Sequence, residues 1–220
     1  MKVGVNGAVR DISDLKVGVN GAVRAVSEAY IGVNGAVKKV WPLISIGYQV
    51  ILDTVGEGTW VCPASGDWKA ELHGGGGGGG GGGRSYSGGG GGGSGELYTV
   101  YFAYGQQVNY SIGEGGAGGS RYSSPTPALR GRVGGTTTFG SYSINGGNGG
   151  VAGNSMNASG GTHSGSLSSN GRAGGHSPGS GGVGNSKNPD QLYGTGGAGG
   201  FASVIGGTGE DGAIILTYLG

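Results

Sequence analysis

Charged residues are scarce in this chain. They make up 11% of its 220 residues, and the formal net charge is +1. A protein that neutralises a phosphate backbone carries a basic stripe or patch, and the sequence has none, so nucleic-acid binding is not expected. The small net charge also argues against a solvated, disordered tail.

Cysteine, proline and long apolar runs are also rare. Cys62 is the single cysteine, which excludes an intrachain disulfide framework, and no His or Lys near it in sequence activates its thiol. The 6 prolines are too few for a collagen helix. No apolar stretch has the length of a membrane span. Residues 1–4 lack the hydrophobic core of a secretory signal, so we expect a protein made in the cytosol and delivered outside by lysis, as virion proteins are.

Glycine, in contrast, supplies 62 of the 220 residues. Such a composition is typical of disorder, because glycine loses the most conformational entropy on folding. The alternative is an ordered lattice of backbone, and the spacing of the glycines distinguishes the two.

A fourteen-residue repeat fills the first 43 residues, with copies that start at Lys2, Lys16 and Tyr30. Each copy has Asn–Gly at its centre, the pair that best tolerates the positive φ angles of a type I′ turn, and β-branched residues flank this pair. The repeat therefore predicts three tandem β-hairpins. The predicted turn residues are Asn6, Gly7, Asn20, Gly21, Asn34 and Gly35.

The strand register that such a turn imposes on the first copy pairs Val5 with Ala8, Gly4 with Val9, and Val3 with Arg10. A lone hairpin is marginally stable in water, so these hairpins need one another or other chains to bury their valines. We interpret residues 1–43 as a structural module for attachment or oligomerisation. A ligand-binding repeat is the alternative, but such repeats usually present stacked aromatics, and this region offers only Tyr30 and Trp41.

Conventional β sequence begins at residue 44. Strands are expected at residues 44–52, 59–62 and 67–72, with turns at residues 56–58 and 63–66. In the third strand, Trp68, Ala70 and Leu72 share one face, while Lys69 and Glu71 take the other. Further strands are expected at residues 96–104, 107–112 and 212–219, and together these strands bracket the glycine tracts.

Two uninterrupted glycine runs, Gly74 to Gly83 and Gly88 to Gly93, lie between the strands, and a Gly-Gly-X period appears at residues 115–120, 145–151 and 195–201. Three residues per turn is the geometry of polyproline II. Such a helix has three edges. Where neighbouring helices enclose all three edges, every residue must be glycine. Where they enclose two edges, every third residue can carry a side chain that points outward. We therefore expect residues 74–83 to form an interior helix of roughly 31 Å, surrounded by the Gly-Gly-X tracts. Flexible linkers are the alternative.

Two parts of the chain resemble known families. The VGVNGAVR-type repeats resemble short repeats in tail-associated proteins of phages and prophages of Gram-positive bacteria, over roughly the first fifth of the chain. The order of residues 58–63 (GTWVCP), a glycine run, residues 136–140 (TTTFG) and residues 211–215 (DGAII) resembles the glycine-rich domain of phage tail proteins, over about residues 50–220. Related polyproline II bundles occur in long-tail-fibre tip adhesins, in certain receptor tyrosine kinases and in small antifreeze proteins.

The residues and the resemblance together predict a mainly β fold with a glycine-rich polyproline II helix bundle and essentially no α-helix. Tandem β-hairpins occupy residues 1–43. Residues 44–220 form a β-sandwich-like frame that encloses the Gly-Gly-X helices.

The histidines and carboxylates of the chain do not have the spacing that catalytic or metal sites require. His73, His163 and His176 do not stand at metal-ligand spacing with another His or Cys. Glu210 and Asp211 are adjacent and indicate a turn rather than a glycosidase pair. The glycine runs lack the Gly-Lys-Ser/Thr ending of a phosphate-binding loop. We expect no enzyme activity, no cofactor and no metal site.

Polar and aromatic side chains that interrupt the glycine are the candidates for recognition, because loops on rigid scaffolds commonly bind partners. Tyrosine with Ser, Gly and Asn is typical of adaptable recognition loops, and arginine and tyrosine also stack on sugars. Residues 84–87 break the two longest glycine runs and are expected at an end of the bundle. Solubilising turns are the alternative interpretation. The candidate receptor-binding residues are Arg84, Tyr86, Arg121, Tyr122, Asn170, Arg172, His176 and Lys187.

The function that the resemblance implies is host-receptor binding by a phage tail fibre or tail tip protein. Its partners would be a bacterial cell-surface receptor, glycan or protein, and other tail proteins. It would be a homo-oligomer, for which a trimer is one candidate state. It would be assembled in the host cytoplasm and located in the virion, with no membrane insertion. A purely structural virion component and an ice-binding protein are the alternatives.

Overall fold

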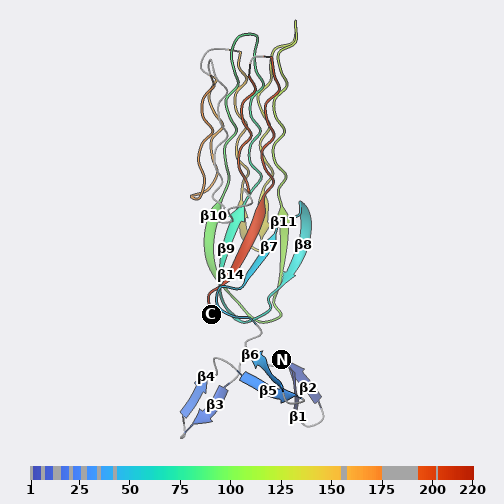
Figure 1. Ribbon diagram of the computed structural model, residues 1–220, viewed down its shortest axis with the longest axis vertical. Helices are drawn as coiled ribbons and strands as arrows, with labels where there is room; N and C mark the ends of the chain where they lie inside the picture. The colour runs from blue at the N-terminus through green and yellow to red at the C-terminus, as the bar shows by residue number, and fades with distance from the viewer. Residues whose placement is uncertain are drawn as a thin grey trace.

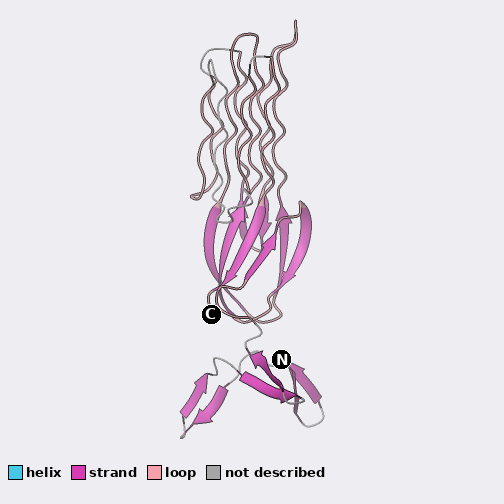
Figure 2. Ribbon diagram, viewed as in Figure 1, coloured by secondary structure: helices cyan, strands magenta, loops and turns pink. Residues whose placement is uncertain are grey.

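The computed structural model describes residues 44–154, 158–174, 193–201 and 203–220, together with the backbone of six strands among residues 1–43. The described residues are antiparallel β-strands and long extended segments, and no helix occurs among them (Figures 1 and 2). Within this described part of the chain there is thus no helix of the length and apolarity that crossing a membrane requires.

The six N-terminal strands pair as three antiparallel hairpins. The first hairpin pairs Val5 with Ala8 and Gly4 with Val9, which confirms the predicted register. The second hairpin has the same register. The third has this register next to its turn and an irregularity between Ala29 and Tyr30. The predicted turn residues Asn6, Gly7, Asn20, Gly21, Asn34 and Gly35 lie outside the described residues. The strands are β1 (Lys2–Val5), β2 (Ala8–Asp11), β3 (Lys16–Val19), β4 (Ala22–Ala25), β5 (Ala29–Val33) and β6 (Ala36–Trp41).

Eight further strands form two antiparallel four-stranded sheets, ordered β10-β9-β14-β7 and β13-β12-β11-β8. The final strand, β14, pairs with both β7 and β9, so the end of the chain closes the first sheet. The strands are β7 (Gln49–Leu52), β8 (Gly56–Val61), β9 (Gly66–His73), β10 (Glu96–Phe102), β11 (Gln107–Ile112), β12 (Thr137–Phe139), β13 (Tyr142–Ile144) and β14 (Ala213–Tyr218).

Two predicted boundaries in this region are wrong. The strand expected from residue 44 begins only at Gln49, and the turn expected at residues 56–58 belongs to β8. Gly58 pairs with Tyr110 across the sheet, and a Cβ at Gly58 would lie 2.5 Å from the Tyr110 ring. The glycine makes room for a cross-strand aromatic ring and is no sign of a chain reversal.

Alternating side chains of the two sheets meet in one core. Trp68, Leu72 and Phe139 are completely buried, and the Trp60 ring lies 5.2 Å from that of Trp68 and 5.7 Å from that of Phe139. The Trp60–Trp68 contact is edge-to-face, and such contacts add to the stabilisation that comes from burying aromatic surface. Cys62 is buried beside them and donates its S–H to the Ala64 carbonyl (3.0 Å), and burial raises the pKa of its thiol. The predicted structural role of Cys62 is consistent with this setting.

The opposite face of β9 is partly covered. Glu71 is 4% exposed and forms an ion pair with Lys69 (2.7 Å), next to a small cluster of Tyr193, Ala213 and Ile215. The Tyr193 hydroxyl donates to Asp53 (3.0 Å), and burial together with this bond raises the pKa of Tyr193 to about 12. Lys69 and Glu71 lie on the predicted face, but that face is not fully solvated.

Beyond the sheets the chain continues as a set of extended glycine-rich segments that run side by side along the long axis (Figure 1). We call this set the glycine array and its end farthest from the sheets the tip. Several segments prolong a strand directly: residue 74 follows β9, residue 113 follows β11, and residue 212 precedes β14. The array comprises residues 74–83, 88–93, 113–120, 128–135, 145–154, 158–164, 169–174, 195–201 and 204–212.

Residues 74–83 are all buried at the centre of the array and donate hydrogen bonds in rotation. The N–H groups of residues 75, 78 and 81 donate to carbonyls of residues 129–135. Those of residues 76, 79 and 82 donate to residues 204–210, and those of residues 77, 80 and 83 to residues 86–92, all at 2.8–2.9 Å. Every third N–H of the central segment therefore donates to the same neighbouring segment.

The carbonyls of the central segment accept in a matching rotation. They receive N–H groups from residues 116–122, 147–153 and 197–203, again at 2.8–2.9 Å. Six neighbours therefore enclose the central segment, and each N–H and C=O from residue 75 to residue 83 has a backbone partner. This fulfils the requirement that buried backbone groups be paired, with no side chain involved.

Glycine is required throughout this central segment. A Cβ added at any of residues 75–83 would lie 1.8–2.1 Å from a carbonyl oxygen of a neighbouring segment. The prediction that residues 74–83 are interior is confirmed. Residues 88–93 form a second buried segment, bonded to the first through Gly77 and Gly80.

The outer segments follow the same rule with fewer glycines. In residues 113–120, the exposed positions are Glu114, Ala117 and Ser120, so the predicted outward direction of each third residue is confirmed. Two segments, residues 128–135 and 204–212, were not predicted, because neither has a Gly-Gly-X period. The glycines that face the central segment stand three residues apart in each of them: Gly131 and Gly134, and Gly206 and Gly209. At these glycines a Cβ would again meet the central segment, at 1.9 Å for Gly131 and 2.0 Å for Gly206.

Candidate recognition surface

The tip is built from loops that are tied to the end of the central segment. The Tyr122 N–H donates to the Gly82 carbonyl (2.9 Å), the Ser203 N–H donates to the Gly83 carbonyl (2.9 Å), and the Gly83 N–H donates to the Tyr86 carbonyl (2.8 Å). Three loops that are distant in sequence therefore share one anchor. At these points the loop backbones are tied to the enclosed central segment.

The longest described loop of the tip joins residue 120 to residue 128. Ser123 and Thr126 bond to each other through their backbones, and residues 123–127 are all exposed. Two prolines in this stretch fix φ and remove two donors that would otherwise need partners. The loop is thus a compact, solvent-facing reversal, and the adjacent Arg121 is exposed beside it.

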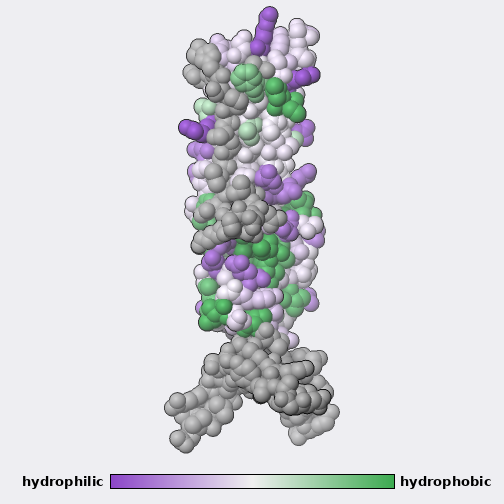
Figure 3. All heavy atoms as spheres, viewed as in Figure 1, coloured by the Kyte–Doolittle hydropathy of each residue, from purple (hydrophilic) through white to green (hydrophobic). Residues whose placement is uncertain are grey.

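Four of the predicted site residues lie at the tip. Arg84 and Arg121 are exposed, and Tyr86 and Tyr122 are half-buried, each within two residues of one of these arginines. The expectation that residues 84–87 lie at an end of the bundle is consistent with this position. The hydrophilic side chains that project at the tip are visible in Figure 3.

The other predicted residues do not join this group. Asn170 lies towards the sheets, where its Oδ1 accepts from the His163 N–H (2.7 Å), and Arg172 lies along the array, where its carbonyl accepts from Gly90. His176 and Lys187 lie outside the described residues. The structure therefore divides the predicted set by position along the array.

Exposed apolar side chains near the tip were missed by the sequence analysis. Phe201, Leu129 and Val204 are 54%, 56% and 48% exposed, and the backbones of Leu129 and Val204 bond to Gly81 and Gly82. Hydrophobic atoms gather just below the tip in Figure 3. The available signal was the Gly-Gly-X period itself, because Phe201 occupies an X position, and X positions point outward.

Charge is distributed unevenly along the array. Glu114, Glu210 and Asp211 lie at the sheet end, where the Glu210 carbonyl accepts from Gly76 and the Asp211 carboxylate accepts from the Gly115 N–H (2.8 Å). The first described arginine lies nearer the tip. The Arg132 carbonyl accepts from the N–H of Gly78, which is two residues beyond Gly76 along the central segment. The described arginines of the array are Arg84, Arg121, Arg130, Arg132 and Arg172, and no ion pair involves them among the described residues.

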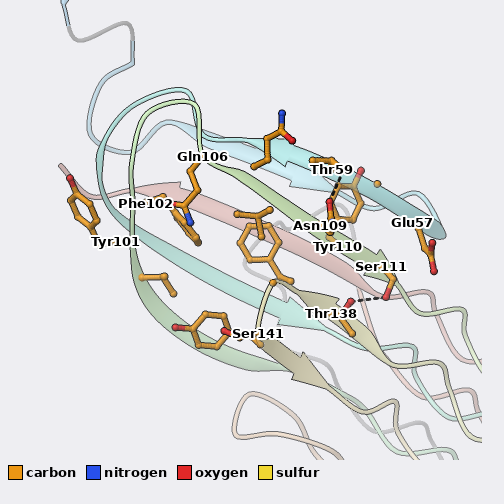
Figure 4. A pocket seen from close by; sticks show the side chains of 17 residues that line it. Glu57, Thr59, Tyr101, Phe102, Gln106, Asn109, Tyr110, Ser111, Thr138 and Ser141 are labelled. Atoms are coloured by element: carbon orange, nitrogen blue, oxygen red, sulfur yellow. Dashed lines mark hydrogen bonds between the residues drawn. The ribbon is translucent and has the colours of Figure 1, made fainter. Parts of the chain in front are cut away.

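A hollow of about 890 Å³ is lined by the second sheet and by β10 of the first sheet. Thr59 and Asn109 at one end are joined by a hydrogen bond of 2.8 Å, as are Ser111 and Thr138, and Tyr101 lies at the opposite end (Figure 4). Its lining contains one carboxylate, Glu57, and no cation. The lining consists of Glu57, Gly58, Thr59, Val100, Tyr101, Phe102, Gln106, Gln107, Val108, Asn109, Tyr110, Ser111, Thr138, Phe139, Gly140, Ser141 and Tyr142.

His73 marks the junction between the sheets and the array. It is completely buried, its Nδ1 lies 3.3 Å from the Ser94 carbonyl, and its Nε2 has no hydrogen-bond partner. Burial lowers the pKa of this imidazole, against the opposing effects of the Ser94 carbonyl and the Glu71 charge. Among the described residues no three His, Cys, Asp or Glu side chains group as metal ligands.

No protein-family model matches the chain, and a search of curated proteins found no match.

Proposed function

We propose that this chain is a receptor-binding adhesin of a phage tail fibre or tail tip, and that its tip loops contact the host surface. The observation that carries the proposal is the anchoring of three loops on the last two glycines of one central segment. Recognition loops bind best when a rigid scaffold holds them, because less conformational entropy is lost on binding.

The proposal includes a specific backbone geometry: the segments of the array are polyproline II helices. Support comes from the rotation of hydrogen bonds, which returns to the same neighbour every three residues. A helix with three residues per turn produces that rotation, and glycine adopts it readily. A circular dichroism spectrum with a polyproline II signature that melts cooperatively is expected, and a gradual, non-cooperative change would count against it.

The hairpins of residues 1–43 have a separate role in this proposal. Two-stranded hairpins are marginally stable in isolation, so they are expected to pack against sister chains or other tail proteins. The chain then acts in the virion as a homo-oligomer, with attachment at residues 1–43 and recognition at the tip. The resemblance of the repeats to tail-associated repeats supports this division.

Cell binding by the full-length chain tests the proposal. A labelled protein is applied to a panel of bacterial cells, and binding to at least one host is expected. Replacing Arg84, Tyr86, Arg121 and Tyr122 by alanine should abolish that binding. The matched control replaces Tyr101 and Gln107, which line the hollow and are exposed, and should bind as the native protein does.

The tip variant and the hollow variant show which of the two surfaces binds the receptor. Loss of binding in the hollow variant with retention in the tip variant would move the receptor site to the sheets. Absence of binding to every host would leave a purely structural component of the virion as the better account.

A further inference from the structure

The arginines of the array have no partner of opposite charge within the described chain. The carboxylates of the array occupy its sheet end, and the described residues of the sheets carry Asp53, Glu57, Asp67, Glu71 and Glu96 against the single cation Lys69. Positive charge is therefore displaced towards the tip. Within residues 44–220, this displacement separates a negative sheet end from a positive stretch of the array towards the tip.

Such an arrangement is costly to the protein itself. Five guanidinium groups on one part of a narrow array repel one another, and among the described residues none of them forms an ion pair that would offset this repulsion. Guanidinium groups match phosphate and carboxylate oxygens with two parallel N–H donors, and they are less strongly hydrated than ammonium groups. A ligand with negative charge would satisfy them.

The chemistry around the two tip arginines narrows the ligand further. Arg84 and Arg121 are exposed, Tyr86 and Tyr122 lie close to them in the chain, and Phe201 is exposed at the end of a neighbouring segment. Cations beside aromatic rings suit a ligand in which charged groups alternate with less polar ones. A single small anion would use only one arginine, whereas the two arginines are on different loops that meet at Gly82 and Gly83.

We infer that the tip binds an anionic surface polymer, one that carries phosphate or carboxylate groups at short intervals along a sugar or polyol chain. The inference rests on the proposed function, because it names the class of receptor for the same tip. Arg84 and Arg121 hold the charged groups, and the adjacent tyrosines contact the intervening units.

The test uses the full chain and three soluble probes: poly(glycerol phosphate), polygalacturonate and neutral dextran. Binding is measured at several salt concentrations. At least one of the two anionic polymers should bind, dextran should not, and the logarithm of the affinity should fall linearly with the logarithm of the salt concentration. The phosphate and uronate arms show which anionic group is recognised.

Two double variants with equal charge locate the site. Arg84→Gln with Arg121→Gln should weaken polymer binding by roughly tenfold or more and reduce the salt slope by about one for each arginine removed. Arg130→Gln with Arg132→Gln removes the same charge from the side of the array and should change affinity by less than about threefold. All four side chains are exposed, so both variants should unfold at the native temperature.

The outcomes distinguish this inference from the proposed function. Suppose that the protein binds host cells, that this binding does not depend on salt, and that neither anionic polymer binds. The proposed function would then stand and the inference would be overturned. Equal losses in the two double variants also overturn it, since the charge would then act through the whole array. A protein that binds no host cell removes the proposed function itself.

Discussion

The sheets and the glycine array both have a closely packed interior, but the sheets fill it with side chains and the array fills it with backbone. In the sheets, large side chains such as Trp68, Leu72 and Phe139 fill the interior completely. In the array, the interior is backbone alone, and six neighbours approach the central segment so closely that a methyl group has no room. One interior is stabilised by apolar burial, at about 25 cal/mol per Å². The other depends on hydrogen bonds of roughly 0.5–1.5 kcal/mol net each.

This difference predicts different tolerance to substitution. A side-chain interior accepts changes that conserve volume, because neighbouring rotamers adjust. A backbone interior has no rotamers to adjust, so any Cβ must displace a neighbouring chain. The array should therefore be the less tolerant region although its residues are the simplest.

The largest effect is expected from Gly79→Ala. Its Cβ would lie 1.9 Å from the Ala198 carbonyl oxygen, so the neighbouring segment has to move and its hydrogen bonds are lost. We expect a loss of more than about 4 kcal/mol of unfolding free energy, or no folded array, in a chemical denaturation experiment.

Gly207→Ala is the matched control for that substitution. A Cβ there has its nearest neighbour at 3.2 Å, and residue 207 is exposed. Its cost should stay below about 1 kcal/mol, because only a small local adjustment is needed. Equal effects of the two alanines would mean that the array is not close-packed.

A smaller but still large effect is expected in the sheets. Trp68→Ala removes a completely buried ring that contacts the Trp60 and Tyr218 rings at 5.2 Å, and should lower the unfolding free energy by about 3–5 kcal/mol. Trp68→Phe, which keeps an aromatic ring, should recover a substantial part of that loss. Thermal unfolding of the two variants checks this graded response, which the interior glycines cannot show.

The smallest effect is expected at the junction, from the titration of His73. Burial holds the pKa of the folded imidazole below 6.5. As the pH falls through 6.5, the unfolded chain takes up a proton before the folded one does, so stability that is present above 6.5 is lost on acidification. The unfolding free energy of the native protein should fall more between about pH 7.5 and pH 5 than that of His73→Gln. Parallel curves for the two proteins would remove His73 as the cause.

Sequence reasoning succeeded where a local repeat determines the structure. Asn–Gly between β-branched residues fixes the register of the first hairpin, and uninterrupted glycine at residues 74–83 requires an enclosed segment. The outward direction of Ala117 follows from its place in the Gly-Gly-X period. In each case the constraint lies within a few neighbouring residues.

Features that depend on distant parts of the chain were not predictable in the same way. Residues 128–135 and 204–212 lack a Gly-Gly-X period and resemble ordinary loops in the sequence. The spacing of three between Gly131 and Gly134, and between Gly206 and Gly209, is explained only by the central segment beside them. Gly58 reads as a turn until Tyr110 is placed across from it. The position of Arg84 was predictable from the break in the glycine, but the anchoring of the Arg121 loop on the neighbouring Gly82 required the packing of the segments.

Amide hydrogen exchange of the glycines at residues 75–83 tests most directly whether backbone alone forms an interior here. The protein is prepared with isotope-labelled glycine and its exchange is followed by nuclear magnetic resonance. The account predicts that these N–H groups exchange as slowly as that of Ala70 in β9, through global unfolding, because each has a buried carbonyl partner. Exchange at the rate of an unstructured glycine peptide would contradict it.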